Sequence, residues 1–271
     1  MKKKNILILG GSGYIGANIV SSLQDYNFIN ISKNRINQEA SNNIIVDITK
    51  GLDFLRFSKD IDCIINCTDI ADCGDDKNYR CYANSMQKLT YLMDKIKVKK
   101  IIHFSNYAQP RESNNSYIQN KLLAERVIEH SGAQFIIFKT TQVFGENSML
   151  DGILKRLSKS TVVSKAIATK KLSPVFIGDV VKNVKYAIEN DDCWNSSYVV
   201  CGPEEIELGE AINRYSLKKI KTIKVPNLLS KIYMSAIFDK KIINFYESYI
   251  DVEPMKINCE YPSLLKAQKF Y

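Results

Sequence analysis

Residues 3–20, KKNILILGGSGYIGANIV, decide the fold. An aliphatic run predicts a buried strand, and the apolar residues after the glycines recur with helical spacing. Gly10, Gly13 and Gly16 would permit a tight turn, let the backbone approach a pyrophosphate, and let the helix pack closely on the strand. The first helical turn would then offer its free N–H groups to a phosphate. The stretch therefore predicts a dinucleotide-binding turn, with a merely structural turn as the alternative.

The composition is that of an ordinary α/β protein with enough apolar residues for a substantial core. Of the 271 residues, 45% are hydrophobic and 25% are charged, and no apolar run reaches the length of a membrane span. The first apolar run is needed as a strand, so we expect no secretory signal and a cytoplasmic protein. The seven cysteines are an odd number without a C-x-x-C pair, which favours reduced, buried thiols and no metal site.

The formal net charge of +9 arises from lysines scattered along the chain, with denser groups near positions 170, 220 and 240. Such groups usually form solvated faces, although they would also attract an anionic ligand. The basic residues are not interleaved with aromatic residues in a pattern that would bind nucleic acid. We therefore expect an anionic small-molecule substrate and no nucleic-acid partner.

The end of the second predicted strand, residues 27–32 (NFINIS), concerns the choice of cofactor. An acidic residue there would bind the adenosine ribose hydroxyls of NAD, whereas basic and hydroxyl residues suit the additional phosphate of NADP. Ser32, Lys33 and Arg35 are present, and a carboxylate is not. The sequence thus favours NADP(H) over NAD(H), and the alternative is that Lys33 and Arg35 are solvated loop residues.

The third predicted strand, residues 43–46, is followed by Asp47 and Ile48. At this place a side chain can reach the edge of the adenine. Asp47 could equally cap the turn into a helix over residues 52–57, and the sequence does not choose between the two.

The fourth predicted strand, residues 61–67, delivers Cys67 and Thr68 to the same edge of a parallel sheet, where ligands collect. A fifth strand follows over residues 100–105. His103 lies inside it between two large apolar neighbours, which favours a packed strand residue over a catalytic base.

The segment after the fifth strand carries the candidate proton-transfer residues. Tyr117 and Lys121 begin a helical register of apolar residues, and their spacing puts both on one face of that helix. A lysine ammonium beside a phenol lowers the pKa of the phenol, which makes it usable as an acid or base near neutral pH. Such pairs also occur by chance on many helices. This pair indicates a catalytic role because it follows the fifth strand of a predicted nucleotide-binding fold with a glycine turn.

In this order the motifs resemble the short-chain dehydrogenase/reductase superfamily, in its extended or atypical branch of nucleotide-sugar epimerases, dehydratases and keto-sugar reductases. They cover most of the chain: GGSGYIG, DCIINC, KIIHFS, YIQNK, FIIFKTTQVFG and SPVFIGDVVKNVKYAIE. The resemblance implies an α/β fold with a Rossmann-like, doubly wound parallel sheet, NAD(P) across its carboxyl edge, and a small C-terminal substrate lobe. It also implies that Tyr117 donates or accepts the proton, while Lys121 binds the nicotinamide ribose and tunes the tyrosine.

Three places depart from the pattern of the superfamily, one of which is Lys139-Thr140, where many relatives have Arg-Pro after the sixth strand. Extended members carry a Ser or Thr just past the fifth strand that hydrogen-bonds the reacting carbonyl. Here Ser105 could fill that role, or Asn106 or Tyr107 could replace it, since an Asn amide can also donate to a developing oxyanion. Asp69 stands where a small residue is usual, and a carboxylate beside a pyrophosphate must turn away or pair.

The expected site is thus a cofactor cradle with a proton-transfer group beside it. The candidate catalytic residues are Tyr117, Lys121, Ser105 and Asn106. The candidate cofactor-binding residues are Gly10, Gly11, Ser12, Gly13, Tyr14, Ile15, Gly16, Ser32, Lys33, Arg35, Asp47, Ile48, Cys67, Thr68 and Lys121.

We expect residues 1–148 to form the NAD(P)-binding domain. Residues 149–271 would return partly to the sheet and otherwise build the smaller substrate lobe. Within them, Asp179 is expected to cap a helix over residues 180–189. The amphipathic, basic stretch at 226–245 could cover the active site, form a homodimer or touch a membrane surface.

Two functions remain in competition. The first is an NAD(P)(H)-dependent oxidoreductase acting on a nucleotide-linked sugar or similar carbonyl substrate, or an epimerase if one retained cofactor oxidises and re-reduces the same substrate. The second is a non-catalytic NADP(H)-binding regulatory or complex-assembly protein of the same fold. The intact pair of Tyr117 and Lys121 favours the enzyme, and the altered segment after the fifth strand favours the binding protein.

Overall fold

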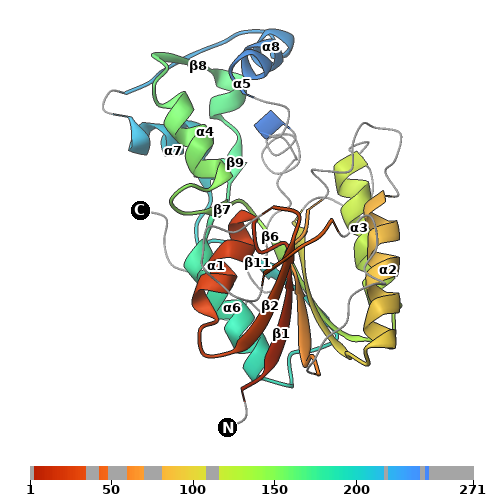
Figure 1. Cartoon of the computed structure of the whole chain (residues 1–271). Helices are drawn as coiled ribbons and strands as arrows, with labels where there is room; N and C mark the ends of the chain where they lie inside the picture. Colours follow the sequence, from red (N-terminus) through yellow and green to blue (C-terminus); the bar gives the residue numbers. More distant parts are fainter. Residues whose placement is uncertain are drawn as a thin grey trace.

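The computed structural model describes residues 3–34, 43–47, 60–69, 81–107, 116–216, 219–238 and 242–243. Within these residues a seven-stranded sheet of parallel pairs has the order β11-β6-β5-β4-β1-β2-β3. Its strands are β1 (Asn5–Leu9), β2 (Asn27–Ser32), β3 (Asn43–Ile45), β4 (Cys63–Asn66), β5 (Lys100–Asn106), β6 (Gln134–Thr140) and β11 (Ser196–Val200). The strand order reverses on either side of β1, which is the place where parallel sheets of this kind bind ligands. The predicted α/β, Rossmann-like fold is confirmed (Figure 1).

Helices cover both faces of the sheet, as its runs of aliphatic residues require. On one face α1 (Tyr14–Ser22) and α6 (Ile177–Glu189) pack against each other, and on the other α2 (Cys81–Lys95) and α3 (Ser116–Glu129) do so (Figure 1). Each face has its own apolar core, because side chains of one strand alternate between the two sides. In β1, Ile6 and Ile8 join the core under α1, whereas Leu7 and Leu9 join the core under α2.

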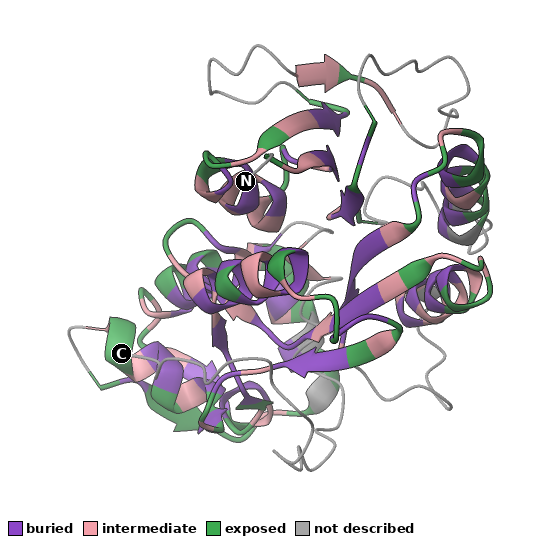
Figure 2. Ribbon diagram, turned by 90° about the horizontal axis from the view of Figure 1, so that it is seen from below, coloured by how far each residue is buried: buried purple, intermediate pink, exposed green. Residues whose placement is uncertain are grey.

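Figure 2 shows buried residues along the strands and on the inward sides of the helices. In α2 the buried side includes Tyr82, Met86, Leu89 and Met93, all fully or almost fully buried. This spacing places them on one side of the helix, so the sequence pattern alone determines which side of α2 faces the sheet.

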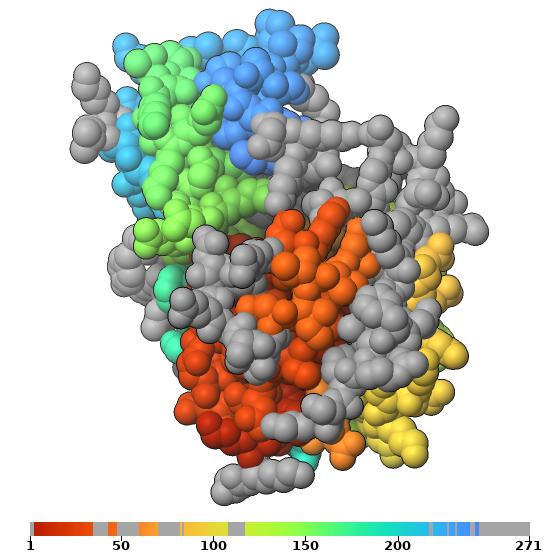
Figure 3. Space-filling view, viewed as in Figure 1, coloured from red at the N-terminus to blue at the C-terminus, as the bar shows by residue number. Residues whose placement is uncertain are grey.

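A third apolar core lies outside the two sheet cores and forms a lobe. It is built by α4 (Met149–Leu157), α5 (Lys165–Ala168), α7 (Leu208–Tyr215) and α8 (Asn227–Ile237). Three two-stranded ladders accompany them: β7 (Val143–Phe144) with β10 (Val175–Phe176), β8 (Val162–Ser164) with β13 (Lys221–Ile223), and β9 (Lys171–Leu172) with β12 (Ile206–Glu207). The lobe stands over the carboxyl ends of the strands, in Figure 1 and again in the space-filling view of Figure 3.

The chain leaves the sheet for this lobe and then returns to it. After β10, α6 packs beside α1, and β11 pairs in parallel with β6 at the edge of the sheet. The second half of the chain therefore contributes to the sheet layer as well as to the lobe.

The helix α8 differs from the other lobe helices in what it exposes. Met234 and Phe238 enter the lobe core, whereas Leu228, Leu229 and Ile232 remain exposed. None of the helices in the described parts of the chain is both long and apolar enough to span a membrane.

The expected strands at 27–32, 43–46, 61–67 and 100–105 all appear, with ends that differ by no more than a few residues. The prediction that Asp179 caps the following helix is wrong. The helix α6 begins at Ile177 with Phe176 as its N-cap residue, so Asp179 is already inside the first turn. Its carboxylate lies 3.2 Å from the ammonium of Lys182 and still places negative charge at the positive end of the helix.

Candidate active site

The glycine turn joins β1 to α1 and touches the neighbouring strand end. Gly10 has a φ of +83°, and a Cβ atom there would lie 2.9 Å from the backbone of Cys67 and of Thr68. A Cβ atom on Gly16 would lie 2.3 Å from the carbonyl oxygen of Gly10. A side chain at either position would therefore push apart the turn, the helix and the end of β4.

The amino end of α1 is open to an anion. Its N-cap residue, Gly13, makes no side-chain capping hydrogen bond, and no acidic residue stands in the first turn. Free N–H groups at the positive end of a helix dipole suit a phosphate. The glycine turn therefore fits the pyrophosphate of a dinucleotide cofactor.

Asn30 braces this turn, and the sequence analysis did not single it out. It is fully buried in β2, where its Oδ1 atom accepts a hydrogen bond of 3.0 Å from the N–H of Gly11. Its Nδ2 atom donates to Oδ1 of Asn43 at 3.1 Å and to Oγ of Ser32 at 3.3 Å. The available signal was an amide side chain in the middle of an otherwise apolar strand, NFINIS.

Residues at the ends of β2 and β3 lie close together, because the two strands are parallel neighbours in the sheet. Ser32 is buried, and its hydroxyl donates to the carbonyl oxygen of Asn34 at 2.7 Å. The ammonium of Lys33 lies 4.0 Å from the carboxylate of Asp47, and about half of the Lys33 side chain is exposed. The other two candidates at these ends, Arg35 and Ile48, lie outside the described residues, as does the helix predicted over residues 52–57.

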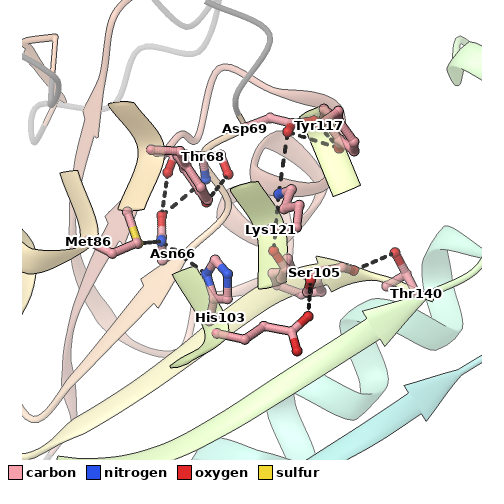
Figure 4. A network of polar contacts seen from close by, with 12 residues as sticks. Asn66, Thr68, Asp69, Met86, His103, Ser105, Tyr117, Lys121 and Thr140 are labelled. Atoms are coloured by element: carbon pink, nitrogen blue, oxygen red, sulfur yellow. Dashed lines mark hydrogen bonds and ion pairs between the residues drawn. The ribbon is translucent and has the colours of Figure 1, made fainter. Parts of the chain in front are cut away.

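The end of β4 is held by a buried polar network (Figure 4). Oδ1 of Asn66 accepts hydrogen bonds from the N–H and from the hydroxyl of Thr68, and the hydroxyl of Tyr82 donates to the carbonyl oxygen of Thr68 at 2.8 Å. The Nδ2 atom of Asn66 lies 3.1 Å from Nδ1 of His103. Burial, and then the charge of Lys121, hold the pKa of His103 well below its usual range. His103 is therefore a neutral, packed residue of β5, as the sequence favoured.

Tyr117 and Lys121 lie one turn apart on α3 and converge on the same carboxylate (Figure 4). The hydroxyl of Tyr117 donates to Oδ1 of Asp69 at 3.0 Å, and the ammonium of Lys121 lies 3.3 Å from that oxygen. The Lys121 side chain is 5% exposed and also donates to the carbonyl oxygen of Phe104 at 3.3 Å. The structure thus brings the predicted pair to the carboxyl ends of β4 and β5, beside the glycine turn. Asp69 joins this pair. Its carboxylate contacts Tyr117 and Lys121, so it is paired, which is one of the two arrangements expected for a carboxylate at that position.

The hydroxyl of Ser105 is engaged by Glu125, which lies one turn beyond Lys121 on α3. This hydroxyl donates to Oε1 of Glu125 at 2.5 Å, and Oε2 of Glu125 lies 2.8 Å from the ammonium of Lys139. Glu125 is almost fully buried, so the two partners compensate a carboxylate that would otherwise be costly there. The sequence analysis did not identify Glu125, because a glutamate in a helix carries no sign of burial.

Asn106 and Tyr107 complete the segment after β5. Asn106 is 5% exposed, and its Nδ2 atom has no hydrogen-bond partner among the described residues. The N–H of Tyr107 donates to the carbonyl oxygen of Thr140 at 2.8 Å. A buried amide donor without a hydrogen-bond partner costs folding free energy. A ligand oxygen could accept a hydrogen bond from it and remove this cost.

Two of the candidate residues at the β4 end differ in how they can interact with a cofactor. Burial raises the pKa of the Cys67 thiol, although the charge of Lys121 opposes this, so the thiol stays protonated and unreactive. Thr68 contributes its backbone to the contact with Gly10. Both residues therefore shape the edge of the site and supply no charge to it.

Comparisons with known proteins agree with this arrangement. A model of the NAD dependent epimerase/dehydratase family matches residues 6–201. Among solved structures, a nucleoside-diphosphate-sugar epimerase from Staphylococcus aureus is 16% identical with a TM-score of 0.67, and the match covers 92% of each chain. MoeE5 in complex with UDP-glucose and NAD is 15% identical with a TM-score of 0.66, covering 82% of this chain and 85% of that one.

The likeness extends to a protein of another description. The terminal R domain from the myxalamid PKS-NRPS biosynthetic pathway is 15% identical with a TM-score of 0.70, covering 94% of this chain and 82% of that one. Identities this low establish a shared fold only. The family model spans the sheet from β1 to the end of β11, and it establishes the family. The chain belongs to the NAD dependent epimerase/dehydratase family.

Proposed function

We propose that this protein is an NAD(P)(H)-dependent oxidoreductase or epimerase acting on a nucleotide-linked sugar or a similar carbonyl substrate. The observation that carries the proposal is the convergence of Tyr117 and Lys121 beside the glycine turn, at the carboxyl ends of the central strands. A phenol and an ammonium held together there can exchange a proton with a carbonyl or hydroxyl oxygen.

Each group has a separate task in this proposal. A bound nicotinamide would supply or accept the hydride. Tyr117 moves the proton at its hydroxyl, and the buried ammonium of Lys121 stabilises the phenolate and binds the ribose hydroxyls. The unpaired Nδ2 atom of Asn106 is the best candidate for a hydrogen-bond donor to the reacting oxygen, since the hydroxyl of Ser105 is taken by Glu125.

The substrate class follows from charge and from the solved neighbours. A net charge of +9 favours an anionic ligand, and one neighbour of the same fold was solved with UDP-glucose. In this proposal residues 1–148 bind the cofactor. The lobe formed within residues 149–271 binds the substrate from above the strand ends.

Replacement of Tyr117 by Phe tests the proposed chemistry. Removal of the phenolic proton should lower kcat on the order of 100- to 10,000-fold while the Kd for the cofactor stays within about twofold. The measurement is nicotinamide absorbance with a panel of UDP-sugars and UDP-keto-sugars, with product analysis to detect epimers. Tyr91→Phe is the matched control, because Tyr91 is an exposed tyrosine on α2. Equal rates for wild type and Tyr117→Phe would refute the assigned role.

The same proposal includes a preference for NADP(H). Ser32 and the half-exposed ammonium of Lys33 stand at the end of β2, where the additional phosphate of NADP would lie. Lys33→Ala should weaken NADPH binding about tenfold and leave NADH binding nearly unchanged, since only NADPH places a phosphate there. Calorimetry with both cofactors measures this, and Lys95→Ala on α2 is the control. Tighter binding of NADH than of NADPH by the wild-type protein would contradict the preference.

A second candidate function is a cofactor-binding protein without turnover. It is favoured by the engagement of Ser105 with Glu125 and by the carboxylate of Asp69 beside the proton-transfer pair. This reading predicts tight NADPH binding, no turnover with any carbonyl substrate, and co-purification with a partner protein. The panel assay on the wild-type protein separates the two functions.

A further inference from the structure

A third charged group shares the proton-transfer site. Oδ1 of Asp69 accepts the hydrogen bond of Tyr117 at 3.0 Å, and Oδ2 lies 3.2 Å from the same hydroxyl. Oδ1 is also 3.3 Å from the ammonium of Lys121. The phenol therefore has a carboxylate as its acceptor, in addition to a cation one turn along the helix.

Asp69 is delivered to this position by the polar network at the end of β4. Asn66 holds both the N–H and the hydroxyl of Thr68, and Tyr82 holds its carbonyl oxygen. The residue directly before Asp69 is thus tied down by three hydrogen bonds. About half of the Asp69 side chain is exposed, which leaves its carboxylate hydrated on one side.

Among the described residues, the titratable groups around the pair of Tyr117 and Lys121 come from α3, the end of β4, α2 and β5. Lys121 lies on α3, and Asp69 follows β4. From α2, the ring of Tyr82 lies 5.1 Å from the ammonium of Lys121, and burial raises the pKa of that tyrosine, so it is neutral. From β5, His103 is buried and neutral, as described above. Of these groups, Asp69 and Lys121 carry charge, and their charges are opposite.

The two charges act on the phenol in opposite directions. Lys121 favours the phenolate, whereas a carboxylate that accepts the phenol's hydrogen bond favours the neutral phenol and repels the phenolate. Asp69 also neutralises part of the charge of Lys121, since both contacts involve the same oxygen. Removal of the Asp69 charge must therefore lower the pKa of Tyr117.

We propose that Asp69 is a positioning residue that keeps Tyr117 protonated, and so directs the site toward proton donation and carbonyl reduction. The inference rests on the proposed role of Tyr117. In the favoured direction a bound, reduced nicotinamide would supply the hydride to the substrate carbon and would itself be oxidised. The O–H bond of Tyr117 breaks as an O–H bond forms on the substrate oxygen, and water then reprotonates the phenolate beside Asp69.

The test measures the protonation of Tyr117 directly in the protein without substrate. Tyrosine labelled with ¹³C at Cζ shifts its resonance when the phenol ionises, and the Tyr117→Phe protein identifies the signal. In Asp69→Asn the midpoint of this titration should fall by about one pH unit relative to wild type. Asp94→Asn, which removes an exposed carboxylate from α2, should leave the midpoint unchanged. An unchanged or higher midpoint in Asp69→Asn would overturn the proposal.

Kinetics in both directions give the second readout. At neutral pH and with saturating substrate and cofactor, Asp69→Asn should raise kcat for substrate oxidation relative to kcat for reduction by about tenfold, because the phenolate fraction grows tenfold for each unit that the pKa falls. Asp69→Glu should restore the wild-type ratio. Failure of the proposed function would give a different result, because Tyr117→Phe would then have the same kcat as wild type. The titration would still report whether Asp69 controls the protonation of Tyr117. A lower midpoint with an unchanged ratio of the two rates would also overturn the proposal, since the charge would then not set the direction.

Discussion

Asn30 shows how a single buried amide can shape a cofactor site from the strand next to it. Its side chain lies in β2, yet its Oδ1 atom holds the N–H of Gly11 in the glycine turn. The same amide reaches Asn43 in β3, so one residue links three successive strands of the sheet. A hydrogen bond of this kind stabilises the fold more in the buried interior than at the surface, because its loss would leave a buried polar group without a partner.

Gly11 is therefore more constrained than its place in the motif implies. A Cβ atom there would lie 2.1 Å from Oδ1 and 2.6 Å from Cγ of Asn30. Gly11→Ala should displace Asn30, distort the turn and raise the Kd for NADPH and NADH alike by about tenfold or more, since the pyrophosphate site itself is altered. Calorimetry provides the measurement.

The matched control for this prediction is Gly152→Ala on α4. A Cβ atom at Gly152 meets nothing within 4 Å, so alanine there should leave cofactor binding intact and stabilise the helix by about 0.5 to 1 kcal/mol. Wild-type cofactor affinity in Gly11→Ala would show that Asn30 does not support the turn.

At the scale of the elements, helix starts show two different designs. The N-cap residue of α1 is Gly13, which has no side chain to cap the helix and leaves its N–H groups for a ligand. The N-cap residue of α4 is Ser148, whose hydroxyl accepts a hydrogen bond of 3.0 Å from the N–H of Asp151. The helices α6, α7 and α8 also lack a side-chain cap, so α1 is distinguished as a candidate binding site by the glycine turn before it.

Ser148→Ala measures the contribution of the α4 cap. Loss of the capping hydrogen bond should lower the free energy of unfolding by about 1 kcal/mol, with little effect on cofactor Kd. Urea denaturation measures the change. Ser21→Ala serves as the control, because Ser21 is an exposed residue within α1 and alanine is the better helix former. Equal destabilisation by both variants would remove the case for a specific cap.

At the scale of the whole molecule, the site assembles from segments that are far apart in the chain. The glycine turn, the end of β4, the end of β5 and the first turns of α3 meet because the three parallel strands β1, β4 and β5 bring their carboxyl ends to one edge. The lobe that stands over this edge follows β6 in the sequence and has its own apolar core. The chain then returns to the sheet through α6 and β11, and it enters the lobe a second time with β12, α7, β13 and α8.

Much of this was readable from local pattern. The glycine spacing after an aliphatic run predicted β1, the turn and α1, and the runs of apolar residues predicted β2, β3, β4 and β5. The pair of Tyr117 and Lys121 was readable because helical periodicity puts both residues on one face. These features depend on residues that are close together in the chain, so they can be predicted from the sequence.

Asp179 marks where local pattern misled. An aspartate before an apolar-periodic run is a common helix cap, yet α6 begins two residues earlier. Phe176 packs against Phe144, with the ring centroids 5.5 Å apart, which places the preceding turn in the apolar core. Tertiary packing thus set the start of the helix and left Asp179 within its first turn.

By itself, the sequence determined the family and the sheet and singled out the pair of Tyr117 and Lys121, since these rest on periodicity and on motif spacing. Only the tertiary structure decided which partner each polar side chain takes. It turned Ser105 toward Glu125, paired Asp69 with Tyr117 and Lys121, and set Asn30 under the glycine turn. The physical reason is that a hydrogen bond or ion pair depends on distances of about 3 Å between atoms that the chain connects only through distant turns.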